Sequence, residues 1–98
     1  DVYDVIVCFN YLHRPLMPEI RRGLRPGGTV VYETLTIDQV QFGRPSNPDY
    51  LLDHDELLRF FRGFDVLRYY EGILSPGRAT AGIIARKPLS EKDIVQDE

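Results

Sequence analysis

Residues 24–35 read LRPGGTVVYETL, and the architecture can be worked out in both directions from them. The Pro-Gly-Gly turn at 26–28 is expected to end a helix, because proline lacks a backbone N–H and glycine tolerates the conformation just past a helix end. The run at 29–35 is rich in β-branched residues, and its apolar first half predicts a strand covered on both faces. A helix followed by a buried strand is therefore expected here.

The preceding residues supply a second strand and the helix that links the two. Residues 5–9 read VIVCF, a continuously apolar run that predicts a central parallel strand, buried on both faces. Met17, Ile20 and Leu24 follow at helical spacing and predict an amphipathic helix. Two strands joined by a helix form a right-handed βαβ unit.

The clearest local signal is a helix start at residues 52–57, which read LDHDEL. Asp53 and Glu56 have the spacing of a capping box, and the leucines on either side have the positions of a hydrophobic staple. The helix is expected to run to Arg62, with Gly63 in the left-handed position just past its end. The irregular segment before it, residues 36–50, is predicted to be a long functional or mobile loop.

The last two predicted strands cover residues 64–71 and 79–87. The connection between them contains Gly72, Pro76 and Gly77 and is too short for a crossover helix, so these strands should be antiparallel. The predicted order is β-α-β-α-β-β, an α/β fold that ends in a hairpin.

Composition excludes several classes of protein. The 98 residues fit one small domain, and 43% hydrophobic with 28% charged residues is ordinary for a folded protein. A net charge of −3 argues against nucleic-acid binding. No apolar run approaches the roughly 20 residues of a membrane span, and the lone Cys8 fits a reducing cytoplasm. Since the sequence enters an apolar strand at once, we expect it to be cut from a longer protein.

Three segments resemble class I S-adenosylmethionine-dependent methyltransferases. Residues 4–14 (DVIVCFNYLHR) resemble the fourth strand and its loop, and residues 24–34 the turn and fifth strand. Residues 44–52 (RPSNPDYLL) are similar to small-molecule methyltransferases of the tellurite-resistance type. The resemblance implies that residues 1–88 form the C-terminal half of a Rossmann-like sheet, strands four to seven. We expect residues 89–98 to be a charged, flexible tail.

Ligands of open α/β sheets bind at the carboxyl ends of the strands, and the resemblance assigns residues there to roles. For cofactor binding it implies Phe9, Asn10, Tyr11 and Leu12. The substrate side would comprise Arg14, Thr34, Arg44 and Asn47, and the catalytic candidates are His13 and Glu33. No metal ligands are expected.

Each catalytic candidate has a structural alternative. His13 is a candidate general base near neutral pH, yet a loop histidine before Arg-Pro is more often solvated or capping. Glu33 ends a buried strand and needs either a functional role or an ion pair with Arg14 or Arg44.

The resemblance implies an S-adenosylmethionine-dependent enzyme that methylates a small molecule in the cytoplasm. The family's Gly-rich cofactor turn and ribose-binding acid do not occur in these residues, since Gly27 and Gly28 lie before a strand and after a helix. We therefore expect a fragment that is inactive alone. It would need its missing N-terminal half, or would self-associate, as in a symmetric dimer, through the strand Val5–Phe9. The alternative is a non-catalytic α/β binding or assembly module.

Overall fold

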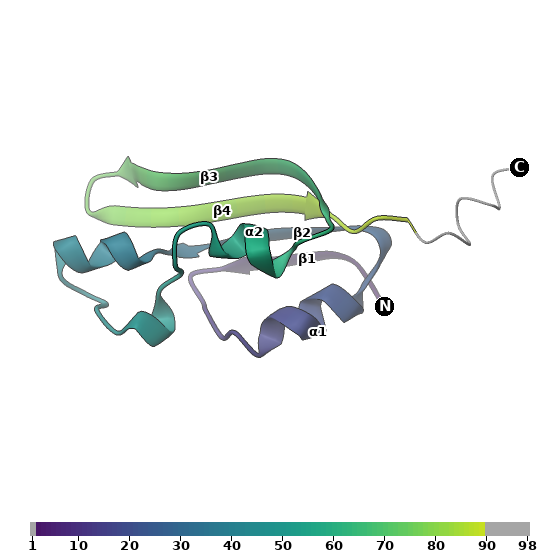
Figure 1. The fold of residues 1–98 in the computed structure, drawn as a ribbon, viewed down its shortest axis with the longest axis horizontal. Helices are drawn as coiled ribbons and strands as arrows, with labels where there is room; N and C mark the ends of the chain where they lie inside the picture. Colours follow the sequence, from purple (N-terminus) through teal and green to yellow (C-terminus); the bar gives the residue numbers. More distant parts are fainter. Residues whose placement is uncertain (1, 90–98) are drawn as a thin grey trace, which may run out of the picture.

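The computed structural model describes residues 2–89 as a four-stranded sheet with two helices (Figure 1). The elements in chain order are β1 (Tyr3–Phe9), α1 (Leu16–Gly23), β2 (Leu24–Leu35), the 3₁₀ segments η1 (Ile37–Phe42) and η2 (Pro48–Tyr50), α2 (Glu56–Phe60), β3 (Asp65–Ser75) and β4 (Arg78–Arg86). The predicted element order and α/β class are confirmed. The predicted tail at 89–98 lies, apart from its first residue, outside the described residues.

The strand order across the sheet is β1-β2-β4-β3. β1 and β2 are parallel, as predicted for strands joined by a helix, and β3 and β4 form the predicted antiparallel hairpin. The hairpin folds back so that β4 pairs with β2, and β1 is left at one edge. Among the described residues, no helix is long and apolar enough to cross a membrane.

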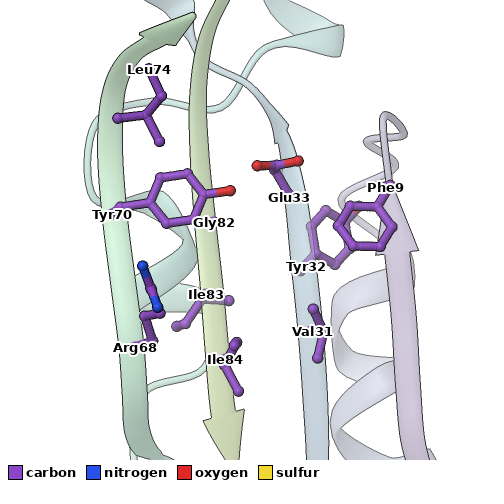
Figure 2. A pocket seen from close by; sticks show the side chains of 10 residues that line it. All are labelled: Phe9, Val31, Tyr32, Glu33, Arg68, Tyr70, Leu74, Gly82, Ile83 and Ile84. Atoms are coloured by element: carbon purple, nitrogen blue, oxygen red, sulfur yellow. The ribbon is translucent and has the colours of Figure 1, made fainter.

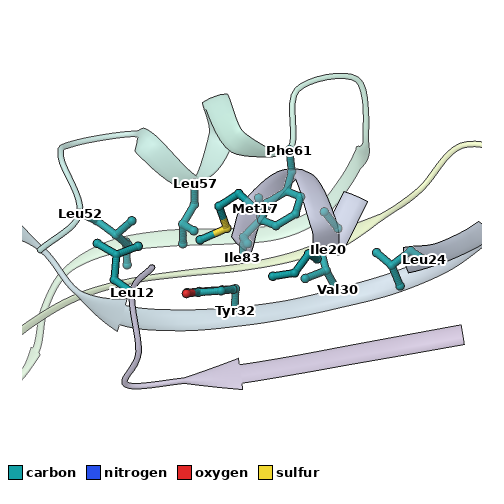
Figure 3. Close-up of a cluster of buried hydrophobic side chains, with 12 residues drawn as sticks. Leu12, Met17, Ile20, Leu24, Val30, Tyr32, Leu52, Leu57, Phe61 and Ile83 are labelled. Carbon is teal, nitrogen blue, oxygen red and sulfur yellow. The ribbon is translucent and has the colours of Figure 1, made fainter. Parts of the chain in front are cut away.

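Both helices cover the same face of the sheet (Figure 3). Met17 and Ile20 of α1, with Leu57 of α2, pack over side chains that point up from the central strands β2 and β4. The core formed in this way consists of Leu12, Met17, Ile20, Leu24, Val30, Tyr32, Leu52, Leu57, Phe61, Ala81, Ile83 and Ala85. Burying these side chains is the main source of stability.

The opposite face of the sheet carries no helix among the described residues. Val5, Val7 and Phe9 of β1 are 56%, 55% and 53% exposed, while Ile6 and Cys8 between them pack against the core. The prediction that residues 5–9 are buried on both faces is therefore wrong for this chain. Alternate residues of a strand point to opposite faces, and only one face is covered here.

Helix α2 differs from the prediction at both ends. It ends at Phe60 instead of Arg62, and its N-cap is Asp55, which has a left-handed φ of 62°. Half of the capping box still forms, because Glu56 Oε1 accepts the backbone N–H of Asp53 at 2.8 Å. The contact that orders this helix start thus survives the shift in its boundary.

The Pro-Gly-Gly turn at 26–28 does not end the first helix, which is a correction to the prediction. Helix α1 ends at Gly23, and the turn lies within the irregular start of β2. The Gly27 N–H donates to the Lys87 carbonyl and the Gly28 carbonyl accepts the Lys87 N–H, both at 2.8 Å. Pairing with the end of the last strand draws this segment into the sheet. Gly27 has the positive φ, 83°, that favours glycine.

Candidate functional site

A cleft of about 340 Å³ lies where β1 and β2 end, at the carboxyl edge of the parallel pair. This is the edge at which ligands bind in open α/β sheets. Three segments meet in the cleft: the loop after β1, the loop after β2 and the start of β4. Its lining residues are Asn10, Tyr11, Leu12, Thr34, Leu35, Pro45, Tyr50 and Arg78.

Asn10, which lines the cleft, has an uncommon backbone conformation. Its φ is 58°, in the left-handed region that asparagine tolerates better than most residues. Its N–H donates to the Glu33 carbonyl at 2.9 Å, and its Oδ1 accepts a hydrogen bond from Arg78 Nη2 at 2.8 Å. The ends of β1 and β2 and the start of β4 are thereby joined through one residue, by its backbone N–H and its side-chain oxygen.

Tyr11 and Leu12 are positioned from the core below them. The Tyr32 hydroxyl donates to the Tyr11 carbonyl, and the Leu12 side chain is buried in the core beside it (Figure 3). Burial raises the pKa of Tyr32, so its hydroxyl remains a donor at neutral pH. The Tyr11 ring itself is left more than half exposed at the cleft.

Asn47 and Arg14 hold the backbone segment that places Tyr50 at the cleft. Asn47 Oδ1 accepts the Asp49 N–H at 2.9 Å and so starts the η2 turn. Arg14 Nη2 donates to the Leu51 carbonyl at 2.8 Å. These two contacts fix the backbone on either side of Tyr50, whose ring stands more than half exposed.

Arg14 also forms a two-point ion pair with Glu56. Nε lies 2.7 Å from Oε2 and Nη2 lies 2.9 Å from Oε1. Burial acts to raise the pKa of Glu56, but the hydrogen bonds from Arg14 and from the Asp53 N–H hold it below its usual value. Arg14 therefore links the loop after β1 to α2. The donors of Arg14, one of the residues predicted for the substrate side, are thus engaged in contacts within the protein.

Glu33 points away from the cleft. It lines a groove of about 490 Å³ on the uncovered face of the sheet, called the sheet-face groove (Figure 2). Phe9, another predicted site residue, lines the same groove, and the Tyr70 ring lies across Gly82 beside Glu33. Within residues 2–89 the Glu33 carboxylate makes no ion pair, so the expected pairing with Arg14 or Arg44 does not form.

His13 lies in a smaller hollow that adjoins the cleft. The two share Leu12 and Tyr50 as lining residues, and His13 is exposed to solvent there. Its backbone carbonyl accepts the Leu16 N–H at 2.9 Å, just before α1. His13 and Glu33 thus line separate hollows.

Of the remaining predicted residues, Thr34 lines the cleft and Arg44 is exposed in the loop before Pro45. Sequence reasoning missed Arg78, which stands 68 positions from its partner Asn10. The hairpin turn before Arg78 was visible in the sequence, but only the pairing of β4 with β2 brings that turn to the cleft.

Known structures share this fold at low sequence identity. The cyclase SpnF matches with a TM-score of 0.62 and 17% identity over 91% of this chain and 51% of its own. TehB from Haemophilus influenzae matches with a TM-score of 0.64 and 20% identity over 87% of this chain and 35% of its own. A possible exported protein from Bordetella parapertussis matches with a TM-score of 0.58 and 22% identity over 88% of this chain and 39% of its own.

The chain spans about a third to a half of the length of these three proteins. No protein-family model and no curated protein sequence matches it. Identities of this size establish the fold alone. The strand order and these likenesses together show that the described chain has a class I S-adenosylmethionine-dependent methyltransferase-like fold.

Proposed function

We propose that this chain is part of an S-adenosylmethionine-dependent methyltransferase that acts on a small molecule. The observation that carries the proposal is the cleft at the carboxyl ends of β1 and β2, with Asn10 locked in a left-handed conformation at its floor. The methyltransferase-like fold and the position of the cleft in it support the same function.

The residues of the cleft fit one end of the cofactor. Asn10 and Thr34 offer polar groups, and Tyr11 and Leu12 offer apolar surface, which suits the methionine end with its carbon chain. Among the described residues no acid lines the cleft to hold a ribose. The remainder of the cofactor site would therefore come from chain alongside β1.

S-adenosylmethionine supplies a methyl group activated by a positively charged sulfur. Asn10, Tyr11 and Leu12 would hold the methionine end of the cofactor, which would supply its methyl group with a neutral sulfide as the leaving group. Because this leaving group needs no proton, the residues of the cleft align the reactants and exclude water. Tyr11 and Tyr50, exposed on two sides of the cleft, are placed for that role.

His13 is the better of the two candidates for a general base in this proposal. It lies in the hollow that adjoins the cleft through Leu12 and Tyr50, whereas Glu33 faces the sheet-face groove. An imidazole can accept a proton from an acceptor group near neutral pH.

The uncovered edge and face of the sheet favour a requirement for more protein. β1 is an edge strand whose exposed side chains Val5, Val7 and Phe9 are apolar, and edges of this kind pair with other strands. The missing N-terminal half of a longer protein, or a second copy of this chain, would supply that strand. The same surface favours the alternative function, a binding or assembly module without catalysis.

Calorimetric titration with S-adenosylmethionine tests the proposal. The 98-residue chain should bind weakly or not at all, and a protein that includes the coding sequence upstream of Asp1 should bind. In the longer protein Asn10→Ala should weaken binding, while Asp65→Asn, at the far end of β3, should leave it unchanged. Absence of binding in the longer protein would remove the enzyme proposal and leave the assembly module.

A further inference from the structure

Arg78 lines the cleft and has a neutral group as its hydrogen-bond partner. Its Nη2 donates to the amide oxygen of Asn10 at 2.8 Å. Among the lining residues that the structure describes it is the one with a formal charge. Within residues 2–89 no carboxylate lies within ion-pair distance of it.

Three other arginines have their charge or donors satisfied, whereas Arg44, Arg68 and Arg86, which do not line the cleft, make no ion pair within residues 2–89. Arg14 pairs with Glu56, and Arg22 pairs with Glu19. Arg21 donates to two backbone carbonyls at the end of α2. A guanidinium has five N–H donors in a planar fork, so Arg78 keeps donors free after its one bond to Asn10. A carboxylate matches that fork.

The surroundings of Arg78 specify the rest of the ligand. Tyr11 and Tyr50 are 54% and 59% exposed, and Leu35 and Pro45 add apolar surface to the same cleft. Aromatic side chains with free faces pack well against flat apolar molecules. A cleft with one free cation among apolar walls suits an anion carried on an apolar body.

We propose that Arg78 binds the carboxylate of a small aromatic or apolar acid, which is the methyl acceptor of the cleft. Asn10 positions the guanidinium without neutralising it, because an amide oxygen carries no charge. The identity of this ligand as a methyl acceptor rests on the proposed function, but its binding does not. The cofactor's methionine portion also carries a carboxylate, so the test includes methionine itself.

Binding is measured by NMR, from shifts of the backbone amides of the ¹⁵N-labelled 98-residue chain. Benzoate should move the amides of Asn10, Tyr11 and Tyr50 saturably, and benzamide, the neutral analogue, should bind about tenfold more weakly or less. Benzamide binding as well as benzoate would overturn the proposal. Tighter binding of L-methionine than of benzoate would assign the carboxylate site to the cofactor and overturn the acceptor assignment.

Four variants locate the effect at one charge. Arg78→Gln should lose benzoate binding by about tenfold or more, and Asn10→Asp should do the same, because the new carboxylate would pair with the guanidinium. Arg86→Gln removes the same charge from the other end of β4 and should bind benzoate unchanged. A dispersed amide spectrum establishes that each variant is folded, and Arg78→Lys provides a second variant that keeps the charge. Equal binding by Arg78→Gln and Arg86→Gln would refute the proposal.

The outcome is separable from that of the proposed function. Benzoate binding to the 98-residue chain needs no cofactor. If the longer protein fails to bind S-adenosylmethionine while benzoate still binds through Arg78, methyl transfer is refuted and the carboxylate site stands. If benzoate does not bind but the longer protein binds S-adenosylmethionine, the carboxylate site is refuted and the proposed function stands.

Discussion

Replacing Glu56 with glutamine should lower the free energy of unfolding by about 2 kcal/mol. Arg14 donates two hydrogen bonds to this carboxylate, at 2.7 and 2.9 Å, and hydrogen bonds to a charged group contribute about 1.5–3 kcal/mol each. Glutamine keeps one neutral oxygen as an acceptor, so only one of the two bonds is lost, and the Arg14 side chain is 34% exposed, so water screens part of that loss. Both facts favour the lower part of that range.

Thermal unfolding followed by circular dichroism at pH 7 measures the effect. For a domain of this size 1 kcal/mol corresponds to about 4–8 °C, so Tm should fall by roughly 8–16 °C. The matched control is Glu19→Gln, which removes an acid from an exposed pair with Arg22 and should change Tm by at most a few degrees. Equal Tm values for the two variants would refute the structural role given to the Arg14–Glu56 pair.

The same pair predicts how stability depends on pH. Arg14 holds the pKa of Glu56 below its usual value in the folded protein. A carboxyl group with a lowered folded pKa stabilises the fold above its unfolded pKa, about 4.3 for glutamate, and this contribution is lost as pH falls through the folded pKa. The Tm difference between the natural chain and Glu56→Gln should therefore shrink below about pH 4. A difference that stays constant down to pH 2 would contradict the assignment.

Other changes test separate parts of the structure. The pKa of His54 is raised by its hydrogen bond to Asp38, so its NMR titration midpoint should lie above about 6.5 and fall in Asp38→Asn; an unchanged midpoint would rule out this contact. Since the folded pKa is raised, any stabilisation from His54 is present at low pH and is lost as pH rises through that midpoint. Tyr32→Phe removes the donor to the Tyr11 carbonyl and should cost about 1 kcal/mol in urea unfolding, with altered shifts in the loop after β1. Val7→Lys puts a charge on the exposed edge strand and should reduce self-association in sedimentation velocity; a natural chain that is monomeric at high concentration would contradict the proposed pairing.

Local patterns accounted for much of the fold. The helical spacing of Met17 and Ile20 predicted a helix whose buried side is now seen, and the short connection between the last two strands predicted their hairpin. The prediction that residues 5–9 are buried on both faces was wrong. An apolar run indicates that a strand can be buried, but not whether something covers each face.

The candidate site was predictable as a region rather than as a set of contacts. Asn10, Tyr11, Leu12 and Thr34 line the cleft because the ends of parallel strands meet at one edge, which follows from chain order alone. Whether these residues bind the cofactor stays a prediction. The roles of Arg14 and Asn47 could not be read in the same way, because their partners are set by packing.

The sequence therefore specified the elements, their order and the edge of the sheet at which a ligand would bind, since these depend on periodicity and turn chemistry between near neighbours. Tertiary structure settled which charges remain free. Arg14 is paired because α2 brings Glu56 to it across 42 positions. Arg78 meets a neutral amide because β4 inserts between β2 and β3. Both outcomes depend on distances through space between residues far apart in the chain, which no local pattern encodes.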